Sequence, residues 1–369
     1  MAAPLSHFPQ LLFFLALFSD LWPCFLSAVN ITHLPGFAGA LPFRLETGYV
    51  NMDADSGAEL FYYFVESERN PSEDPLLLWL TGGPGCSGFN ALALAMGLLQ
   101  IASMIFLDWP FGTGFSHSRT DKDYFTDDWH AKQLIYVFLK KWLLDHPFFL
   151  SNPFYMGVNH MVGKWLHLFL MRLFKVSKLP IFISYEDGYL IGNAITGEKG
   201  DKNTQASHAY GLGLISEEVY KVLTGDLLSN YWLNNRLVRQ ALHIKEGSVG
   251  RWHRCDFNVN AHHYKRNIPS SLPHHRNLTS RGYRALVYNG DHDLKVPFVG
   301  TLKWIKSLGY SILDPWRAWY VDNQVAGFTT LFSNDITFVT VKGRESHNAG
   351  NRPAQCFGMF KRWISHEVL

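Results

Sequence analysis

The feature of this 369-residue chain that most constrains its fold is a series of short, continuous apolar runs separated by helix-like stretches. The runs span 76–80, 104–107, 154–156, 181–183, 285–288 and 336–341. Runs of this length are typical of strands buried on both faces of a sheet. The stretches 129–144, 165–176, 235–243, 300–308 and 354–366 have helical spacing. This alternation predicts an α/β fold with a mostly parallel, doubly wound central sheet.

Other parts of the chain depart from this alternation. Leu45–Asp53 and Glu59–Glu66 are predicted as an antiparallel pair at one edge of the sheet. Residues 196–234 are polar and glycine-rich, which favours a short insertion, or cap, above the sheet. We therefore expect core segments at 29–195 and 235–369 on either side of this insertion.

The first 28 residues have the pattern of an export signal. Leu11 to Phe18 is an apolar run, and Leu26-Ser27-Ala28 offers a cleavage site with small residues. Retention of this segment as a membrane anchor is the alternative. Cleavage predicts a protein of the secretory pathway, extracellular or vacuolar, with no membrane association afterwards.

The glycosylation sequons and the cysteines are consistent with the secretory pathway. Asn30-Ile31-Thr32 and Asn277-Leu278-Thr279 are candidate glycosylation sites. Removal of the signal would leave three of the four cysteines, so at least one thiol lacks an intramolecular partner. The formal net charge of +2 and the lack of a basic run exclude nucleic acid as an expected partner.

A sharp turn is expected where the run at 154–156 ends. In α/β-hydrolases this turn has the form G-x-S-x-G and exposes a nucleophilic serine. Here Val158 stands at the first glycine, His160 at the serine and Val162 at the second glycine. No serine elsewhere has glycine on both sides at this spacing. Ser87 lies in a glycine-rich loop and is a poor substitute.

The other parts of a serine-hydrolase site occur in the expected order. The loop at 81–87 (TGGPGCS) follows a predicted buried strand, where a backbone N–H of an oxyanion hole would originate. Asp293 and His347 follow in the order nucleophile, acid, histidine. The sequence therefore predicts an α/β-hydrolase fold whose nucleophile is replaced.

Several long motifs in the right order resemble one family. They are ITHLPGF at 31–37, LLLWLTGGPGCS at 76–87, FLDWPFGTGFS at 106–116, NPFY at 152–155, GN at 192–193, GDHDLKVP at 290–297 and CFGMFKRWI at 356–364. The chain resembles plant serine carboxypeptidase-like proteins, which include serine carboxypeptidases and glucose-ester acyltransferases. The resemblance implies a small-molecule ester or a peptide as substrate and no cofactor or metal.

The resemblance also implies roles for individual residues. Gly83 and Met161 would supply the two oxyanion N–H groups. His347 would be the base, and Asp293 would orient it. His347 matches the histidine loop of the family only when one extra residue upstream is allowed.

Two further positions would contact substrate, and two cysteines would pair. Thr81 stands where peptidases of the family tend to have Asn and acyltransferase-like members Thr. Asn159 replaces the acidic residue that normally precedes the serine. Cys86 and Cys255 match cysteines that are bridged in the family, which leaves Cys356 unpaired.

Compared with the family pattern, the chain is shortened. Blocks are missing between Gln100 and Ile101 and between Gly225 and Tyr231, and both help to wall the substrate pocket in the family. Misplaced splice boundaries in the gene would produce the same departures.

Four hypotheses follow from the histidine at the nucleophile position. The leading one is a family member whose chemistry is lost or strongly impaired, because removal of a triad nucleophile costs a factor of about a million in turnover. Alternatively, His160 is itself acylated, with His347 as base. Third, His160, His347 and Asp293 bind a metal ion. Fourth, the fold binds a ligand without catalysis. The adjacent pairs His262-His263 and His274-His275 are predicted to be surface residues.

Overall fold

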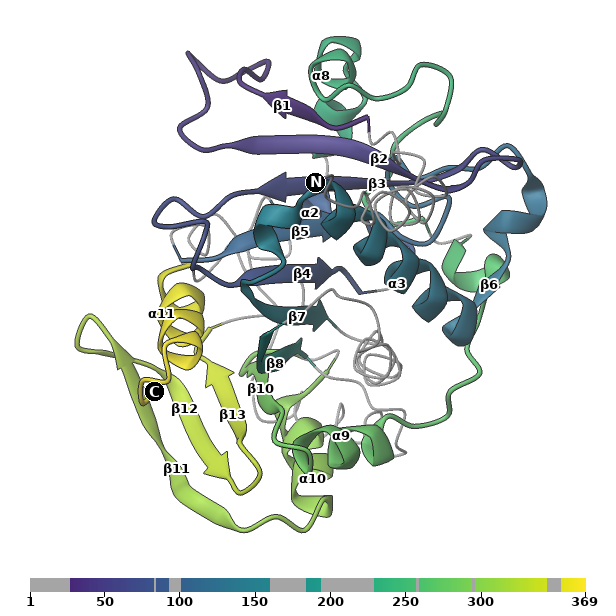
Figure 1. Ribbon diagram of the computed structural model, residues 1–369. Helices are drawn as coiled ribbons and strands as arrows, with labels where there is room; N and C mark the ends of the chain where they lie inside the picture. The colour runs from purple at the N-terminus through teal and green to yellow at the C-terminus, as the bar shows by residue number, and fades with distance from the viewer. Residues whose placement is uncertain are drawn as a thin grey trace, which may run out of the picture.

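The computed structural model describes residues 27–82, 84–92, 101–159, 184–193, 229–256, 259–293, 296–343 and 353–369. In this part of the chain the centre of the molecule is an eleven-stranded sheet, in the order β1-β2-β3-β5-β4-β7-β8-β10-β13-β12-β11 (Figure 1). The strands of the sheet are β1 Val29–Ile31, β2 Leu45–Asp53, β3 Ala58–Val65, β4 Leu76–Leu80, β5 Ser103–Leu107, β7 Pro153–Asn159, β8 Ser184–Gly192, β10 Arg284–Gly290, β11 Ile312–Val321, β12 Gln324–Phe332 and β13 Ile336–Val341.

Helices and short turns connect these strands. They are α2 Phe89–Leu92, η2 Asp121–Tyr124, α3 Asp128–Asp145, η3 Pro147–Phe149, α8 Arg236–Ala241, η5 Val259–His263, α9 Leu272–Thr279, α10 Phe298–Ser307 and α11 Pro353–Ile364. A separate two-stranded sheet pairs β6 Thr126–Asp127 with β9 Tyr264–Lys265. No helix among the described residues combines the length and apolar character that a membrane crossing needs.

The middle of the large sheet is parallel and its edges are antiparallel. β5, β4, β7, β8, β10 and β13 are neighbours in parallel pairing. β1, β2 and β3 add an antiparallel edge, and β12 and β11 add the opposite one. This arrangement confirms the predicted mostly parallel α/β sheet.

Each face of the sheet carries its own hydrophobic core. On one face, α3 buries Ile135, Phe138 and Trp142 against strand residues, and α10 adds Trp304. On the other face α11 buries Trp363 among Tyr155 and its neighbours. Helices therefore cover both faces, as the alternation of strands and helices predicted.

Local sequence signals set the ends of α3. The side chain of Asp127 accepts hydrogen bonds from the backbone N–H groups of Trp129 and His130, at 2.9 and 2.8 Å, and so caps the first turn. The helix ends at Asp145, two residues before Pro147, because proline disfavours helical backbone in the residue before it. The predicted helix at 129–144 is confirmed within one residue at each end.

Three strands differ from the sequence-based expectation. The strand expected at 181–183 lies outside the described residues, and β8 begins at Ser184. β11 and β12 form an antiparallel hairpin that the apolar runs did not predict. The helix expected at 165–176, the N-terminal signal up to residue 26 and the insertion up to residue 228 also lie outside the described residues.

The prediction that both histidine pairs are surface residues is wrong for one pair. The ring of His275 is buried and stacks between the rings of Tyr189 and Trp304, with centroids 5.7 and 4.9 Å away. The hydroxyl of Tyr189 lies 3.0 Å from its Nδ1 atom. Helix α9 turns this histidine toward the sheet, so adjacency in sequence places His274 and His275 in different environments.

A close contact between β4 and β7 makes a prediction about stability. Gly157 pairs with Trp79, and a Cβ at Gly157 would lie 2.4 Å from the Trp79 ring. We expect Gly157→Ala to lower the free energy of unfolding by about 1–3 kcal/mol, because the buried indole must shift. Urea denaturation measures this, with Gly250→Ala as the control, because that Cβ meets open space. Equal stabilities of the two variants would contradict the proposed clash.

Candidate active site

The predicted site residues follow neighbouring strands at one edge of the sheet. β7 ends at Asn159, β10 is followed by Asp293, and β13 leads toward the loop that contains residue 347. The registers Val158↔Ile191, Ile191↔Val287 and Gly290↔Val341 bring the carboxyl ends of β7, β8, β10 and β13 into line. Parallel pairing therefore gathers the strand ends from which the three loops predicted to carry the triad begin.

The loop after β4 lies at the same edge. Leu80 pairs with Val158, so the loop after β4 begins, at Thr81, beside Asn159. The Oγ1 atom of Thr81 is buried, and no hydrogen-bond partner for it is found among the described residues. Gly83, His160, Met161 and His347 lie outside the described residues, so their predicted roles stay predictions.

The predicted acid, Asp293, is held in a tight buried turn. Its side chain is almost fully buried, and its Oδ1 atom accepts a hydrogen bond of 2.9 Å from the Val296 N–H. The Asn289 side chain donates to the Val296 carbonyl at 2.9 Å, which closes the turn from the other side. These bonds fix the direction of the Asp293 carboxyl group relative to β10.

Two residues that were not predicted as site residues hold this edge together. Asp291 accepts a hydrogen bond of 2.7 Å from the Gly343 N–H, so it ties the segment that contains Asp293 to the segment that leads toward residue 347. Asn193 has a left-handed φ of 49° and is fully buried. Its Oδ1 atom accepts from the Gly290 N–H at 3.2 Å, and its own N–H donates to Tyr288 at 2.8 Å. The motif GN at 192–193 was the available signal for Asn193.

The glycine-rich loop is fastened by a disulfide. Cys86 and Cys255 are bonded, as the family resemblance implied, and Cys356 is a free, half-buried thiol. Backbone bonds flank the bridge: the Ser87 N–H donates to Arg254 at 3.0 Å, and the Asp256 N–H donates to Gly85 at 2.8 Å. The loop is therefore joined to a segment 169 residues away in sequence.

A buried carboxylate, Asp108, supports the same loop from below. Its Oδ1 atom accepts from the Ser87 hydroxyl at 2.6 Å and from the Gly88 N–H at 2.7 Å. Its Oδ2 atom accepts from the Phe115 N–H at 2.9 Å. Gly114, with a φ of 54°, is required here, because a Cβ would lie 1.9 Å from that oxygen.

Ser87 is consequently a structural residue. It is completely buried, and its hydroxyl donates to Asp108 rather than to a histidine. A nucleophilic serine needs an exposed hydroxyl beside a base. The geometry agrees with the expectation that Ser87 is a poor substitute nucleophile.

The metal hypothesis concerned residues that the structure describes only in part. Among the described residues no group of three or more His, Cys, Asp or Glu side chains is arranged to hold a metal ion. Asp293 is described, whereas His160 and His347 are not, so that hypothesis stays untested.

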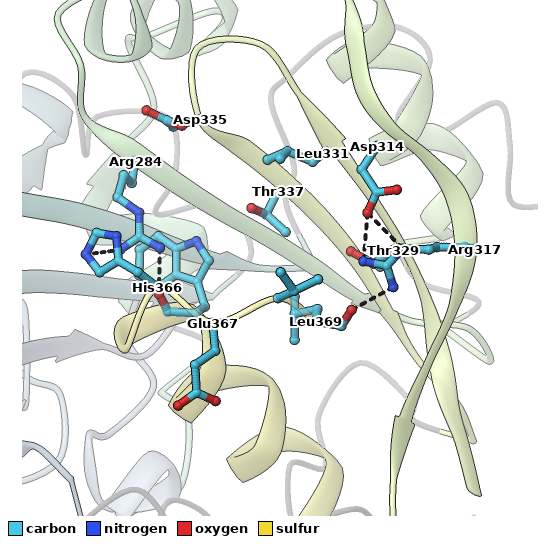
Figure 2. A pocket seen from close by; sticks show the side chains of 12 residues that line it. Arg284, Asp314, Arg317, Thr329, Leu331, Asp335, Thr337, His366, Glu367 and Leu369 are labelled. Carbon is cyan, nitrogen blue, oxygen red and sulfur yellow. Dashed lines mark hydrogen bonds and ion pairs between the residues drawn. The ribbon is translucent and has the colours of Figure 1, made fainter. Parts of the chain in front are cut away.

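A cavity of about 360 Å³ lies at the opposite edge of the sheet, near the first residues of β10 and β13 (Figure 2). Its two arginines have partners within the protein. Arg317 contacts Asp314 at 2.7 Å and the Leu369 carbonyl at 2.6 Å. Arg284 donates to the Trp363 carbonyl at 2.6 Å and stacks on that ring at 4.5 Å. These contacts attach α11 and the residues that follow it to the sheet.

Comparison with known proteins identifies the family. The sequence model of serine carboxypeptidases matches residues 35–228 and 224–366. Serine carboxypeptidase-like 12 of Arabidopsis thaliana is 38% identical over 416 aligned residues, which cover 92% of this chain and 94% of that protein. Serine carboxypeptidase-like 1 of the same plant is 37% identical, with 93% and 94% covered. The chain belongs to the serine carboxypeptidase family.

A solved structure agrees in fold. The prohormone-processing carboxypeptidase Kex1(Δ)p of Saccharomyces cerevisiae superposes with a TM-score of 0.73 at 17% identity, covering 88% of this chain and 92% of that one. The sheet is therefore that of the α/β-hydrolase fold, as predicted. The aligned length of 416 residues exceeds the 369 of this serine carboxypeptidase family member, so the relative contains residues without a counterpart here.

The buried carboxylate makes the stability of this family member depend on pH. Burial raises the pKa of Asp108 to about 6 from 3.8, although its three hydrogen-bond donors oppose the shift. Between these values the folded protein binds more protons than the unfolded chain. The contribution therefore favours folding below pH ~4 and is lost as the pH rises through ~6, by up to about 3 kcal/mol.

Urea denaturation at several pH values between about 4 and 7 tests this shift in pKa. We expect the free energy of unfolding of Asp108→Asn to fall less over this range than that of the natural protein. The variant is less stable at neutral pH, because an amide cannot accept from all three donors. Parallel pH profiles for the two proteins would contradict the assignment.

The two sequons differ in exposure, which gives a second prediction. Asn30 is exposed on β1, whereas Asn277 lies half-buried within α9 with a buried Oδ1 atom. Thr279, the third residue of that sequon, is buried and donates to the His275 carbonyl at 2.9 Å. We expect one glycan, at Asn30. Mass spectrometry before and after glycosidase treatment checks this, and loss of a glycan in Asn277→Gln would contradict it.

Proposed function

We propose that this chain is a member of the serine carboxypeptidase family that has lost the nucleophilic chemistry of the family. The observation that carries the proposal is the position of β7. This strand lies in the parallel centre of the sheet, between β4 and β8, and ends at Asn159. The next residue is His160, where a serine hydroxyl would be needed.

The scale of the loss supports this proposal. Without its nucleophile, a serine hydrolase loses roughly a million-fold in turnover, or about 8–9 kcal/mol of transition-state stabilisation. An oxyanion hole and a positioned acid recover only a small part of that. Ser87, the serine of the neighbouring loop, is buried and bonded to Asp108.

The proposal also includes a class of substrate, which rests on membership of the family. Thr81 at the start of the glycine-rich loop favours an ester of the acyltransferase type over a peptide C-terminus as the ancestral substrate. The segment 196–234 is proposed to be a shortened cap. The predicted export signal, the sequons and the Cys86–Cys255 disulfide favour the secretory pathway as the destination.

A fluorophosphonate probe tests the missing hydroxyl. We expect no labelling of the natural protein, because such probes react with an activated serine. His160→Ser should restore labelling, since the proposal requires only the hydroxyl to be absent. Labelling of that variant should then fall in the double variant that also carries Asp293→Asn.

The controls separate loss of chemistry from loss of fold. Thermal unfolding of all three proteins should show the same cooperative transition. Ser87→Ala, added to the His160→Ser variant, serves as a matched serine control and should leave the labelling of that variant unchanged. Stoichiometric labelling of a serine in the natural protein would overturn the proposal.

A further inference from the structure

The C-terminal end of α3 is fastened to the antiparallel edge of the sheet by one histidine, His146. Its Nε2 atom lies 3.0 Å from the Glu46 Oε1 atom on β2. Its Nδ1 atom lies 2.9 Å from the carbonyl oxygen of Trp142, in the last turn of α3. The backbone N–H of His146 donates to the same carbonyl at 2.9 Å. The imidazole ring therefore connects the end of the helix to a strand residue 100 positions earlier in the sequence.

Both hydrogen-bond partners of this ring are acceptors. A backbone carbonyl has no hydrogen to donate, and Glu46 Oε1 already accepts from the Tyr62 hydroxyl at 2.6 Å. A neutral imidazole carries one N–H group, whereas an imidazolium ion carries two. Both hydrogen bonds of the His146 ring therefore form only when the ring is protonated.

Three further features stabilise a positive charge at this position. The His146 ring stacks on the Trp142 indole with centroids 4.0 Å and planes 6° apart, so the cation lies over a π face. It also lies at the C-terminal end of an 18-residue helix, where the helix dipole is negative. The His146 and Glu46 side chains are only 14% and 15% exposed, so salt screens their attraction less than at an open surface.

The elements packed around His146 carry two further titratable groups. Asp145 on α3 adds a second negative charge, which favours the protonated ring. Burial raises the pKa of Tyr62 on β3 far above its ordinary value of 10, so this hydroxyl keeps donating to Glu46. The uncharged neighbours on the packed elements are Phe64 on β3, Phe149 on η3 and Asn30 on β1.

The pKa of His146 reflects the balance of these effects. Burial on its own would lower it, but the hydrogen bonds to Glu46 and to the Trp142 carbonyl outweigh that cost, and the pKa lies above the ordinary value of 6.5. His117 is the contrasting case. It lies 3.5 Å from Glu59 and 3.4 Å from a carbonyl oxygen, and burial lowers its pKa. A nearby carboxylate is therefore not sufficient, and the shorter contacts to two acceptors distinguish His146.

We propose that His146 is a pH-sensitive latch, which holds the C-terminal end of α3 on β2 while its ring is protonated and releases it as the pH rises. Loss of one ring proton removes one of the two hydrogen bonds, so the last turn of α3 opens more often. η3 follows this turn directly and leads through residues 150–152 into β7, the strand that ends at residue 159. An acidic compartment would keep the latch closed.

The pH dependence of this latch has a definite sign. Below about pH 6.5 the ring is protonated in the folded and the unfolded chain alike, so its stabilisation is fully present. As the pH rises through the higher pKa of the folded protein, the ring loses its proton and the stabilisation is lost. This window lies above that of Asp108, whose pKa is about 6. The two effects are therefore separable.

An NMR titration of the full-length secreted protein with isotope-labelled histidine measures the pKa directly. The resonance missing from His146→Phe identifies the ring, and we expect its pKa to lie above 6.5 in the natural protein. Glu46→Gln keeps an acceptor for Tyr62 but removes the charge, so it should lower the pKa of His146 by about 1. Glu66→Gln is the matched control, because Glu66 pairs with the exposed Arg44, and should leave this pKa unchanged.

Hydrogen exchange locates the release. In the natural protein, amides in the last turn of α3 should lose at least about fivefold protection between about pH 6 and pH 8.5, after correction for the intrinsic exchange rate. Amides of β13 are the internal control. His146→Phe keeps a ring to stack on Trp142 but has no proton to lose, so its protection should not change with pH. Glu46→Gln gives a second test that leaves the His146 ring in place.

Three outcomes would overturn the proposal. They are a His146 pKa at or below 6.5, an unchanged pKa in Glu46→Gln, and an equal loss of protection in the natural protein and His146→Phe. None of these measurements involves residue 160, so each leaves the proposed loss of catalysis unaffected. Fluorophosphonate labelling of the natural protein would contradict the loss of catalysis and leave the latch unaffected.

Discussion

Parallel pairing of four adjacent strands is the constraint on which the site depends. β7, β8, β10 and β13 run in the same direction, so the loops that follow them emerge at one edge. A slip of one residue in any register would turn every side chain of that strand to the other face. Continuous burial on both faces specifies this register, and the position of Asp293 follows from it.

The bonds that hold this edge do not involve the nucleophile. Asn193 joins β8 to β10, Asp291 joins the acid loop to the following loop, and Asp108 supports the glycine-rich loop. Each is a buried or half-buried polar group, and the partners through which it holds the edge are backbone N–H groups or a neighbouring hydroxyl. Such bonds stabilise the fold whether residue 160 is serine or histidine. A family member can therefore lose its chemistry while its framework stays under structural constraint.

The sequence predicted the central strands well because burial on both faces leaves a clear apolar run. Leu76–Leu80 and Ile336–Val341 have the predicted bounds. β8 was missed because Glu186, Asp187 and Gly188 interrupt its pattern. Gly188 is needed there, since a Cβ would lie 2.8 Å from the Trp363 ring.

The hairpin of β11 and β12 was missed for a different reason. β11 is an edge strand with shifts in register, and its exposed Ile312, Leu313 and Trp316 do not alternate with polar residues. A turn signal was present, because Asp322 and Asn323 both adopt positive φ in the tight turn between the strands. Burial of His275 was likewise hidden, since it depends on which face α9 turns toward Tyr189 and Trp304.

Two buried carboxylates at the catalytic edge have a structural role that bears on function. Around Asp108 and Asp128, buried carboxylates meet donors from their own chain, and the hydrogen bonds close within the protein. If the nucleophilic chemistry is lost, as we propose, this support remains, because these hydrogen bonds and bond cleavage depend on different residues.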